Sequence, residues 1–537
     1  MKSTTTYSLA LVIVLMLFSS FIMNAQMVLW QKCLGGTASD IGECIVESGD
    51  GGYYVLGATT STDHDVTENF GYVDYWVAKL DADREIVWQK SIGGDGLEGV
   101  DSGGSTNPAH SNIIRTNDGG CLFTGWSGSS NGFDETNHGG SDYVSVKFTS
   151  DGTVEWKKLY GGSQFDKGLC VRQTSDGGYV FSGDGRGYFS PDDGDMTGNH
   201  GWSDAWLVKT DFQGEIEWQK CYGGTTDEYL FSVRQTADEG YIMVGLTNST
   251  DGDVVGQHGY HDGWIVKVDM AGIIEWSKCL GGTLFEYLTD VIETSDGGYL
   301  AIGAAGSADG DIPDLNGGSD GWIIKFDSGG EIEWNETYGG STVDIFQAVT
   351  EVADGYVVTG DVMSTDMDVV GSHGSIDCWL VKVNLDGEMV WQYCAGGSAN
   401  DFPHSIQLTS DNNFIICGHT ESIDGDVVGQ MSTLGIYDIW IVKLNGNGPG
   451  ALVSEMNNEH QIYFNQAQET LNIILENSIS SVELRIFSVD GKLVESHKIA
   501  RSNNEVVDCS SMKAGFYIAE LAVAGRIIES QRFEIIR

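Results

Sequence analysis

The chain has 537 residues, of which 41% are hydrophobic, 78 are acidic and 28 are basic, so the formal net charge is −50. A negative charge of this size repels nucleic acid phosphates and anionic membrane surfaces, and we expect no nucleic acid partner. The 74 glycines follow no three-residue period, and no long apolar run follows the N-terminus, which excludes collagen and membrane channels.

Residues 1–25 have the features of a secretory signal peptide. Lys2 precedes an apolar run from Leu9 to Phe18, and a small residue, Ala25, follows it. The run is too short to act as a spanning helix. We therefore predict that the segment is removed and that the mature chain is exported without a transmembrane segment.

Residues 26–445 contain seven copies of one repeat. Each copy has a tryptophan six residues before the second glycine of a GG pair, then a DGGY-like turn and a DxWxxK segment. The marker tryptophans are Trp30, Trp88, Trp156, Trp218, Trp276, Trp334 and Trp391. Two hairpins per copy give four short strands, and seven such copies of roughly 58 residues predict a seven-bladed β-propeller.

The order of the strands predicts how the ring closes. The repeat region starts with a fourth strand, at 27–32, and ends with a third strand, at 438–444. Pairing of these two segments would complete the last blade and hide both sheet edges. The pattern DxxGxIxWxKxxGG resembles the tryptophan-docking repeat of quinoprotein-type propellers, and GGTxxDxxxxVxxTxDGGYxxxG is similar to bacterial SBBP-like propeller repeats. These resemblances imply a fold and not an activity.

The last part of the chain differs in kind. Residues 446–458 begin with NGNGPG and are predicted to be a linker, and residues 459–537 are predicted to form a small β-sandwich. The segments LNIIL, VELRIFSVDGKLV and GFYIAEL resemble the C-terminal sorting domain of the type IX secretion system of Gram-negative bacteria. The chain departs from that family at Tyr463, where YFNQA replaces a YPNPA-like motif. The resemblance implies a secreted or cell-surface protein whose tail contacts the secretion machinery.

Loop lengths predict a ligand site on one face of the propeller. Tight Asp-Gly turns connect strands one to two and three to four, so the long connections share the other end, where binding residues commonly lie. Two of the three insertions fall in neighbouring blades, which also carry both tryptophans outside the repeat columns. The predicted ligand-binding residues are Trp126, Trp202, Glu98, Asp101, His110, Arg186, Tyr188 and Asp193. The alternative is neutral loop drift with exposed aromatics.

Other repeated residues have structural alternatives. The aspartate pairs Asp251/Asp253 and Asp309/Asp311 have the spacing of calcium loops, or of solvated Asx turns, and calcium is the only cofactor left open. The lysine of DxWxxK suits a structural ion pair, and the histidine column at 138, 200, 258 and 373 suits a turn. Cys378 and Cys394 are predicted to face each other across one hairpin, where an exported protein could form a disulfide.

These features favour an exported binding module for a glycan, a protein or a cation over an enzyme. An enzyme needs polar residues that break the repeat and converge in a pocket, and few such breaks stand out. The alternatives are a propeller enzyme acting on polysaccharide, with a quinoprotein-like oxidoreductase less favoured, and a structural surface scaffold.

Overall fold

A computed structural model describes residues 27–99, 111–133, 136–187, 192–433 and 435–449. Between residues 460 and 535 it describes the strands and part of their connections. The chain divides into two compact units, Met1–Gly450 and Ala451–Arg537. The described residues contain no helix that is long and apolar enough to cross a membrane.

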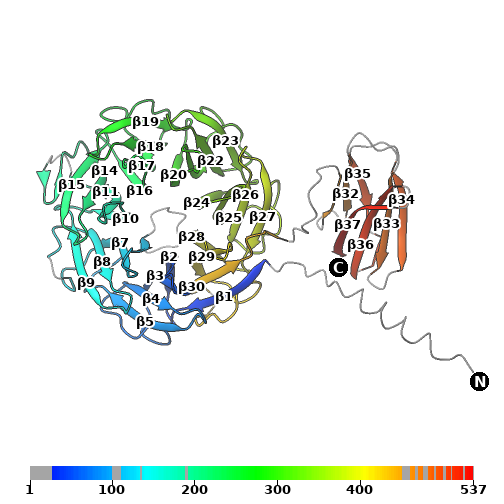
Figure 1. The fold of residues 1–537 in the computed structure, drawn as a ribbon, viewed down its shortest axis with the longest axis horizontal. Helices are drawn as coiled ribbons and strands as arrows, with labels where there is room; N and C mark the ends of the chain where they lie inside the picture. The colour runs from blue at the N-terminus through cyan, green and yellow to red at the C-terminus, as the bar shows by residue number, and fades with distance from the viewer. Residues whose placement is uncertain are drawn as a thin grey trace, which may run out of the picture. The chain divides into compact units, whose positions relative to one another are not determined.

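The first unit is a ring of seven four-stranded antiparallel sheets, as the repeat predicts (Figure 1). The innermost strands are β2 (Asp40–Glu47), β6 (Asn112–Arg115), β10 (Lys167–Gln173), β16 (Glu228–Gln235), β20 (Glu286–Glu293), β24 (Asp344–Val352) and β28 (Asp401–Leu408). The second strands are β3 (Tyr53–Thr59), β7 (Cys121–Ser127), β11 (Tyr179–Gly185), β17 (Tyr241–Thr247), β21 (Tyr299–Ala305), β25 (Gly355–Val362) and β29 (Phe414–Thr420).

The two outer positions of each sheet complete the blades. The third strands are β4 (Asp74–Leu80), β8 (Asp142–Phe148), β14 (Asp204–Thr210), β18 (Asp262–Val268), β22 (Asp320–Phe326), β26 (Asp377–Val383) and β30 (Asp438–Leu444). The outermost strands are β1 (Val28–Leu34), β5 (Ile86–Ile92), β9 (Val154–Tyr160), β15 (Ile216–Tyr222), β19 (Ile274–Leu280), β23 (Ile332–Tyr338) and β27 (Met389–Ala395). A short extra hairpin, β12 (Asp192–Asp193) with β13 (Met196–Thr197), lies between β11 and β14 in the chain.

The ring closes as predicted, by pairing the two ends of the repeat region. β1 lies antiparallel to β30, with Val28 opposite Leu444 and Cys33 opposite Trp440. The seventh sheet therefore has the order β28, β29, β30, β1, and its outermost strand comes from the start of the chain. Because β1 and β30 pair in one sheet, the two ends of the repeat region are joined into one cooperative ring. Neither strand leaves an unpaired edge at the point of closure.

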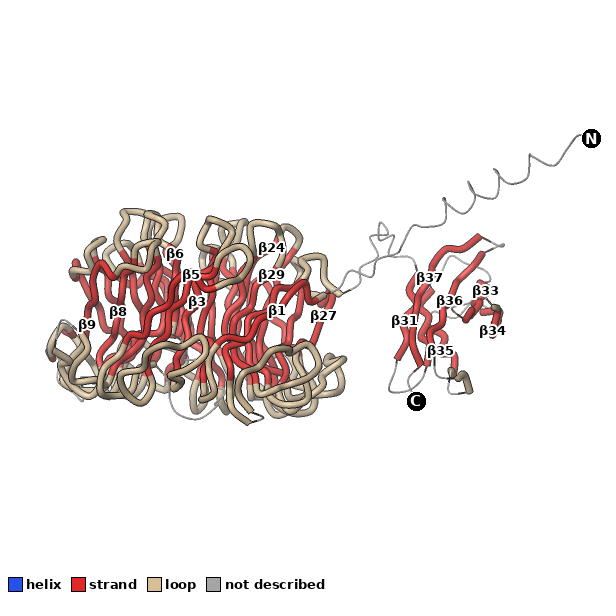
Figure 2. The backbone as a smooth tube through the Cα atoms, turned by 90° about the horizontal axis from the view of Figure 1, so that it is seen from below, coloured by secondary structure: helices blue, strands red, loops and turns tan. Residues whose placement is uncertain are grey.

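The strands run between two layers of loops (Figure 2). One layer holds the tight turns, and we call it the turn end. At the other layer, the loop end, each connection between second and third strands meets the connection into the next blade. Single parallel bridges such as Ser203 to Asp227 and His261 to Phe285 join these connections at six junctions. The predicted division into a short-turn face and a long-loop face is confirmed.

Apolar packing between neighbouring blades is dominated by repeated aromatic columns. The tryptophans of DxWxxK lie in the middle of their blades and are fully buried: Trp76, Trp206, Trp264, Trp322, Trp379 and Trp440. The strands that carry them are almost wholly buried, because a neighbouring blade covers each face. Each such side chain contributes a large buried apolar area, so these columns account for much of the stability of the ring.

A repeated ion pair fastens the turn end of every blade. The DxWxxK lysine reaches the aspartate of the Asp-Gly turn at N–O distances of 2.6 to 3.0 Å in all seven blades. In four of them a glutamate of the outermost strand is a second partner, as Glu275 is for Lys267. The structural role predicted for these lysines is confirmed.

The GG pairs are explained by paired carboxylates at the loop end. A Cβ atom at Gly161 would lie 2.7 Å from Oδ1 of Asp142 and 2.9 Å from Oδ2 of Asp166. At Gly339 the corresponding atoms are Oδ1 of Asp320, at 2.5 Å, and Oδ2 of Asp344, at 2.9 Å. Only glycine fits above two carboxylates that are this close together. The repeat therefore conserves a junction of buried acids as well as a turn.

The second unit consists of two sheets, which confirms the predicted small β-sandwich. One has three strands: β31 (His460–Asn465), β32 (Thr470–Leu475) and β35 (Asn504–Asp508). The other has four: β34 (Leu493–Ile499), β33 (Val482–Ser488), β36 (Gly515–Val523) and β37 (Arg526–Ile535). Leu484, Ile486, Tyr517 and Ala519 are buried on the four-stranded sheet.

The predicted disulfide is corrected by the register of its hairpin. Cys378 lies opposite Ala395, and Cys394 lies opposite Trp379, so the two cysteines are offset by one residue. An offset of one places side chains on opposite faces of a sheet. Cys378 packs in the cluster with Trp440, Cys394 packs in the cluster with Trp379, and both thiols are free.

Candidate functional site

The repeat breaks down along the wall of the central channel. The column seven residues before the turn aspartate holds Glu43, Ser111, Leu169, Phe231, Thr289, Gln347 and His404. The next column holds Cys44, Asn112, Cys170, Ser232, Asp290, Ala348 and Ser405. The column after that is always Ile or Val, as at Ile45 and Val233. All fourteen residues of the first two columns line one cavity of about 250 Å³ at the centre of the ring.

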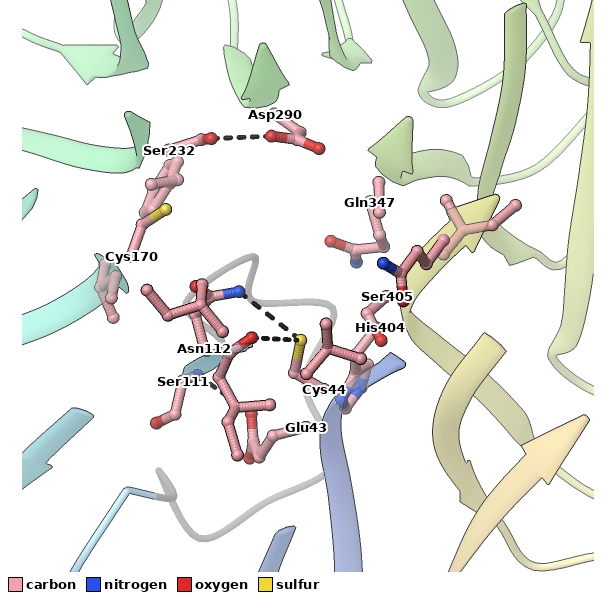
Figure 3. A pocket seen from close by; sticks show the side chains of 18 of the residues that line it. Glu43, Cys44, Ser111, Asn112, Cys170, Ser232, Asp290, Gln347, His404 and Ser405 are labelled. Atoms are coloured by element: carbon pink, nitrogen blue, oxygen red, sulfur yellow. Dashed lines mark hydrogen bonds between the residues drawn. The ribbon is translucent and has the colours of Figure 1, made fainter. Parts of the chain in front are cut away.

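Backbone bulges aim both variable columns at the channel. In β2 the register shifts between Gly42 and Cys44, which leaves Glu43 as the extra residue. The same shift occurs in β10, β16, β20, β24 and β28. Because a bulge places two residues of one strand opposite one of its partner, neighbouring side chains can both face the cavity. Figure 3 shows these side chains surrounding one space from all sides of the ring.

Polar contacts in the cavity connect neighbouring blades. Oγ of Ser232 donates a hydrogen bond of 2.7 Å to Asp290, which also accepts one from Nη2 of Arg234 at 3.1 Å. Backbone N–H groups of Val291 and Val349 donate to the same carboxylate. Asp290 therefore has partners in three blades. Such a network orders the wall of the cavity and fixes where its polar groups lie.

A second set of contacts orders the opposite wall. The backbone N–H of Ser111 donates to Oε2 of Glu43 at 3.1 Å, and Nη1 of Arg172 donates to Oδ1 of Asn112 at 2.6 Å. Burial raises the pKa of the Cys44 and Cys170 thiols, so both stay protonated at neutral pH and neither is an activated nucleophile. The wall offers hydrogen-bonding groups and no thiolate.

The turn end of the channel opens into a larger cavity of about 690 Å³. Its lining includes Arg115, Arg172 and Arg234, from three consecutive inner strands, and one acidic residue, Glu47. Amide side chains of Gln173, Gln235 and Gln407 also line it. Guanidinium, amide and hydroxyl groups thus share this lining with apolar side chains such as Val46 and Ile114, and the polar groups can hydrogen-bond to a polar ligand.

The two tryptophans predicted to form one ligand site have different environments. Trp126 is only 9% exposed, and Nζ of Lys167 lies 5.1 Å from its ring centroid. Its backbone N–H is already engaged, because it donates to the hydroxyl of Tyr75 at 2.8 Å. Trp202 is 52% exposed on the connection into β14. No contact joins the two side chains within the part of the chain that the structure describes, and a shared site stays a prediction.

The remaining predicted ligand residues are only partly described. Glu98 is fully buried, and it accepts a hydrogen bond of 3.0 Å from Ser127. Burial raises its pKa to about 7. Nε of Arg186 lies 3.7 Å from Asp184. Asp193 lies on β12, and Asp101, His110 and Tyr188 lie outside the described residues. Glu98 acts as part of a blade junction in this arrangement.

The predicted calcium aspartates bind backbone groups of the neighbouring connection. Asp251 accepts from the N–H of Thr225 at 2.8 Å, and Asp309 accepts from the N–H of Thr283 at 2.9 Å. Asp253 and Asp311 accept from Gly223 and Gly281, each at 3.2 Å. Among the described residues, no group of three or more His, Cys, Asp or Glu side chains is arranged to hold a metal ion. The Asx-turn alternative accounts for these contacts, and a calcium role stays a prediction.

The histidine column serves the same junctions. The backbone N–H and Nδ1 of His200 both contact Oδ2 of Asp204, at 2.8 and 2.7 Å. His138 and His258 repeat this arrangement, and Asn316 replaces histidine in the fifth blade. The turn-forming role predicted for this column is confirmed.

The sequence did contain a signal for the channel, although the prediction missed it. When the seven copies are aligned on their turn aspartates, two neighbouring columns that vary in chemistry from copy to copy are the ones that line the cavity. Read one strand at a time, they look like ordinary strand positions, and the bulges that turn them inward have no marker residue. The expectation that few positions break the repeat was wrong.

Residues 461–533 match the family model described as "Secretion system C-terminal sorting domain". This supports the predicted sorting role of the tail and implies contact with type IX secretion machinery. The protein is accordingly secreted or displayed at the surface of a Gram-negative bacterium. No curated protein sequence matches the chain.

Solved structures resemble this chain only weakly. A putative gluconolactonase has 8% identity and a TM-score of 0.32, over 77% of this chain and 92% of that one. A puromycin hydrolase mutant has 10% identity and a TM-score of 0.43, over 81% and 58%. An apocarotenoid oxygenase mutant from Synechocystis has 12% identity and a TM-score of 0.38, over 79% and 91%. Likeness at this level carries no argument about activity.

Proposed function

We propose that this protein is an exported binding module whose ligand enters the central channel. One observation carries the proposal. Residues that repeat in all seven blades build the ring, whereas two columns, whose fourteen residues all line the central cavity, differ from blade to blade. A ligand without sevenfold symmetry needs such an uneven wall, because each contact has to match a different part of it.

The nature of the wall favours binding over a purely structural role. A scaffold could fill its centre with apolar side chains, since burying polar groups costs free energy unless they are hydrogen-bonded. Here Glu43, Asp290 and Gln347 are buried at the cavity. A binding role also suits the central cavity better than thiol catalysis does, because the two cavity thiols stay protonated.

Blocking the cavity tests the proposal. The first step is a glycan and peptide array with the mature chain, followed by a thermal-shift assay, since a ligand that binds the folded state raises the melting temperature. Ala348→Trp puts a large ring into the cavity and should abolish binding of the array ligand. Ala82→Trp, in an exposed turn, makes the same change outside the channel and should leave binding unchanged. Equal affinity in both variants would rule out the channel.

The sorting role has its own test. A chain that lacks residues 459–537 should fold as a propeller, because the two units are compact separately. It should accumulate in the periplasm of a host that has a type IX system, whereas the full chain reaches the surface or the medium. Secretion of the shortened chain at the normal level would show that the tail is not the signal.

A further inference from the structure

Arginine is rare in the propeller and is concentrated at one place. Residues 27–454 carry a net charge of −47 and contain five arginines: Arg84, Arg115, Arg172, Arg186 and Arg234. Three of the five line the cavity at the turn end of the channel. They come from three consecutive blades, so three of the five arginines of an otherwise acidic ring lie around one cavity.

These guanidinium groups have spare hydrogen-bonding capacity. Within the described chain Arg115 makes neither a hydrogen bond nor an ion pair through its guanidinium group, and Arg172 forms no ion pair. Nη1 of Arg172 donates to Oδ1 of Asn112 and to the Val171 carbonyl oxygen, both neutral acceptors. Arg234 has a carboxylate partner, Asp290. Each guanidinium has five N–H donors in a fixed plane, so most of these donors remain available to a ligand.

Arg115 also departs from the role that its column has in other blades. At the equivalent position Gln235 accepts from the N–H of Ser175, and Glu47 accepts from the N–H of Ser410. An arginine cannot accept a hydrogen bond, so Arg115 does not bind the neighbouring turn in this way. Its guanidinium instead lies against Gly49, where a Cβ atom would be 2.2 Å from Cζ. The junction gives up one hydrogen bond and keeps a cation at the opening.

The acidic group in this lining is already engaged. Oε2 of Glu47 accepts from the Ser410 N–H at 2.9 Å, and Oε1 accepts from the Ser410 hydroxyl at 3.1 Å. Asp290 forms an ion pair with Arg234 and also lies in the electrostatic field of Arg172. Within the described chain, Arg115 is therefore the guanidinium of this set that has no carboxylate at ion-pair distance, and Arg172 hydrogen-bonds only to neutral acceptors. Planar guanidinium groups favour carboxylates and other oxyanions, to which they can donate two parallel hydrogen bonds.

The surroundings narrow the class of anion. Amide and hydroxyl side chains line the same cavity, and such groups pair with sugar hydroxyls. The ring charge of −47 repels polyanions that come within about one Debye length of its surface, which favours a ligand with one or few charges. We infer that the turn-end cavity, formed by Arg115, Arg172 and Arg234, binds the carboxylate of a sugar acid. This inference rests on the proposed function and names the ligand class.

Calorimetric titration of the mature chain with D-glucuronate, D-glucose and sodium sulfate tests it. Glucuronate should bind at least about tenfold more tightly than glucose, and Arg172→Gln should weaken glucuronate binding about tenfold to hundredfold. Arg115→Gln should also weaken glucuronate binding. Because Arg115 is exposed, this variant tests the cavity even if Arg172→Gln fails to fold. Arg84→Gln makes the same change at the outer edge and should have no effect.

The outcomes separate the inference from the proposed function. Sulfate that binds as tightly as glucuronate would overturn the sugar-acid assignment in favour of a general anion site. Binding of a neutral sugar alone, lost in Ala348→Trp, would overturn the anion inference while the channel proposal stands. If no ligand from the array or the titrations binds the wild-type chain, both fail. Unchanged glucuronate affinity in both arginine variants would also overturn the inference.

Discussion

The body of the blades and the wall of the channel follow opposite rules. In the body, Lys267 and its six counterparts make the same ion pair, and six tryptophans fill the same buried position. In the channel wall, seven copies of one position hold Cys, Asn, Ser, Asp and Ala. Packing between similar blades has the same geometry each time, so the same residue type fits the equivalent position of each blade. The channel has a single centre, where seven identical residues would offer one chemistry only.

The difference teaches where to look for function in a repeat protein. Repeated residues report on the ring, however chemically suggestive they are, and the aspartates of the loop end illustrate this. Asp251 and Asp309 have the spacing of a cation site, yet both bind the backbone of the next connection. Substitutions in the two regions should therefore change different properties, stability in the body and binding in the channel.

The largest expected effect is on a repeated tryptophan. Trp264→Ala removes a fully buried side chain from the core cluster of its blade. It should lower the free energy of unfolding by about 3 to 5 kcal/mol, through lost burial and the cavity that remains. Trp202→Ala removes the same side chain from a half-exposed site and should change stability by less than about 0.5 kcal/mol.

Chemical denaturation followed by tryptophan fluorescence measures both variants. A large loss of stability in Trp202→Ala would show that this residue belongs to the blade body and not to a surface. Its binding phenotype can then be read without a folding correction, which makes the same variant a test of the predicted loop-end site.

The junction acids predict an unusual pH dependence. Burial raises the pKa of Asp166 from 3.8 to about 7 and that of Glu98 from 4.5 to about 7. At a pH between the ordinary pKa and the raised pKa of these groups, the folded state binds more protons than the unfolded state. The free energy of unfolding therefore falls as pH rises from about 4 to about 7. Desolvation of the same kind raises the pKa of Asp40 and Asp320 to about 6.

The ion pairs of the turn end have the opposite effect on how stability depends on pH. Hydrogen bonds from Lys79 and then Ser48 lower the pKa of Asp50 to about 2. This contribution is present above 3.8, the ordinary value, and is lost as pH falls toward about 2. The melting temperature should therefore be highest near about pH 4 to 5 and decline on both sides.

One variant separates the contribution of the loop-end acids from that of the turn-end ion pairs in the dependence of melting temperature on pH. In Glu98→Gln the side chain stays neutral at every pH, so it never places a second negative charge beside the buried Asp74, as ionised Glu98 does. The variant should lose less stability than the wild type between about pH 5 and about pH 8. Melting curves across that range measure the slope, and a steeper decline in the variant would contradict the raised pKa of Glu98.

A smaller effect is expected from one ion pair of the turn end. Lys267 is buried, but its partners Asp238 and Glu275 are about half exposed and can be rehydrated. Lys267→Met should therefore cost only about 1 to 2 kcal/mol, below the cost of breaking a fully buried pair. Lys90→Met, at an exposed position of β5, is the control and should be neutral. A cost of the size expected for Trp264→Ala would mean that the pair organises the whole turn end.

The extent to which the sequence predicts this molecule follows the same division. The seven blades, the closing pair of strands and the face of each loop layer were predictable, because every repeated residue gives seven independent readings of one environment. Cys378 and Cys394 show the limit of counting from a turn. Their hairpin has an irregularity between Lys382 and Val383, which shifts the register by one residue and places the thiols on opposite faces.

The channel was harder to predict for a related reason. Glu43 and His404 face the cavity because of bulges in β2 and β28, and a bulge depends on the backbone more than on any marker residue. The predicted loop-end site had a different basis, since it relied on insertions and on aromatic residues outside the columns. Trp126 met that criterion and yet is buried beside Tyr75 and Lys167.

The smallest predicted effect is a gain in stability from restoring a repeated contact. In blades one, three, six and seven the indole N–H of the DxWxxK tryptophan donates to a glutamine on the outermost strand, as Trp206 does to Gln219 at 2.8 Å. In blade four Ser277 occupies the glutamine position, and Nε1 of Trp264 is buried without a hydrogen-bond partner among the described residues. Ser277→Gln should supply that acceptor and stabilise the protein by about 1 kcal/mol, the typical net value of one such bond. Gln219→Ser makes the reverse change in blade three and should destabilise it by a similar amount. Because neither residue lines the channel, ligand affinity should not change in either variant, and opposite shifts in melting temperature with constant affinity would show that the blade body and the channel wall are energetically separate.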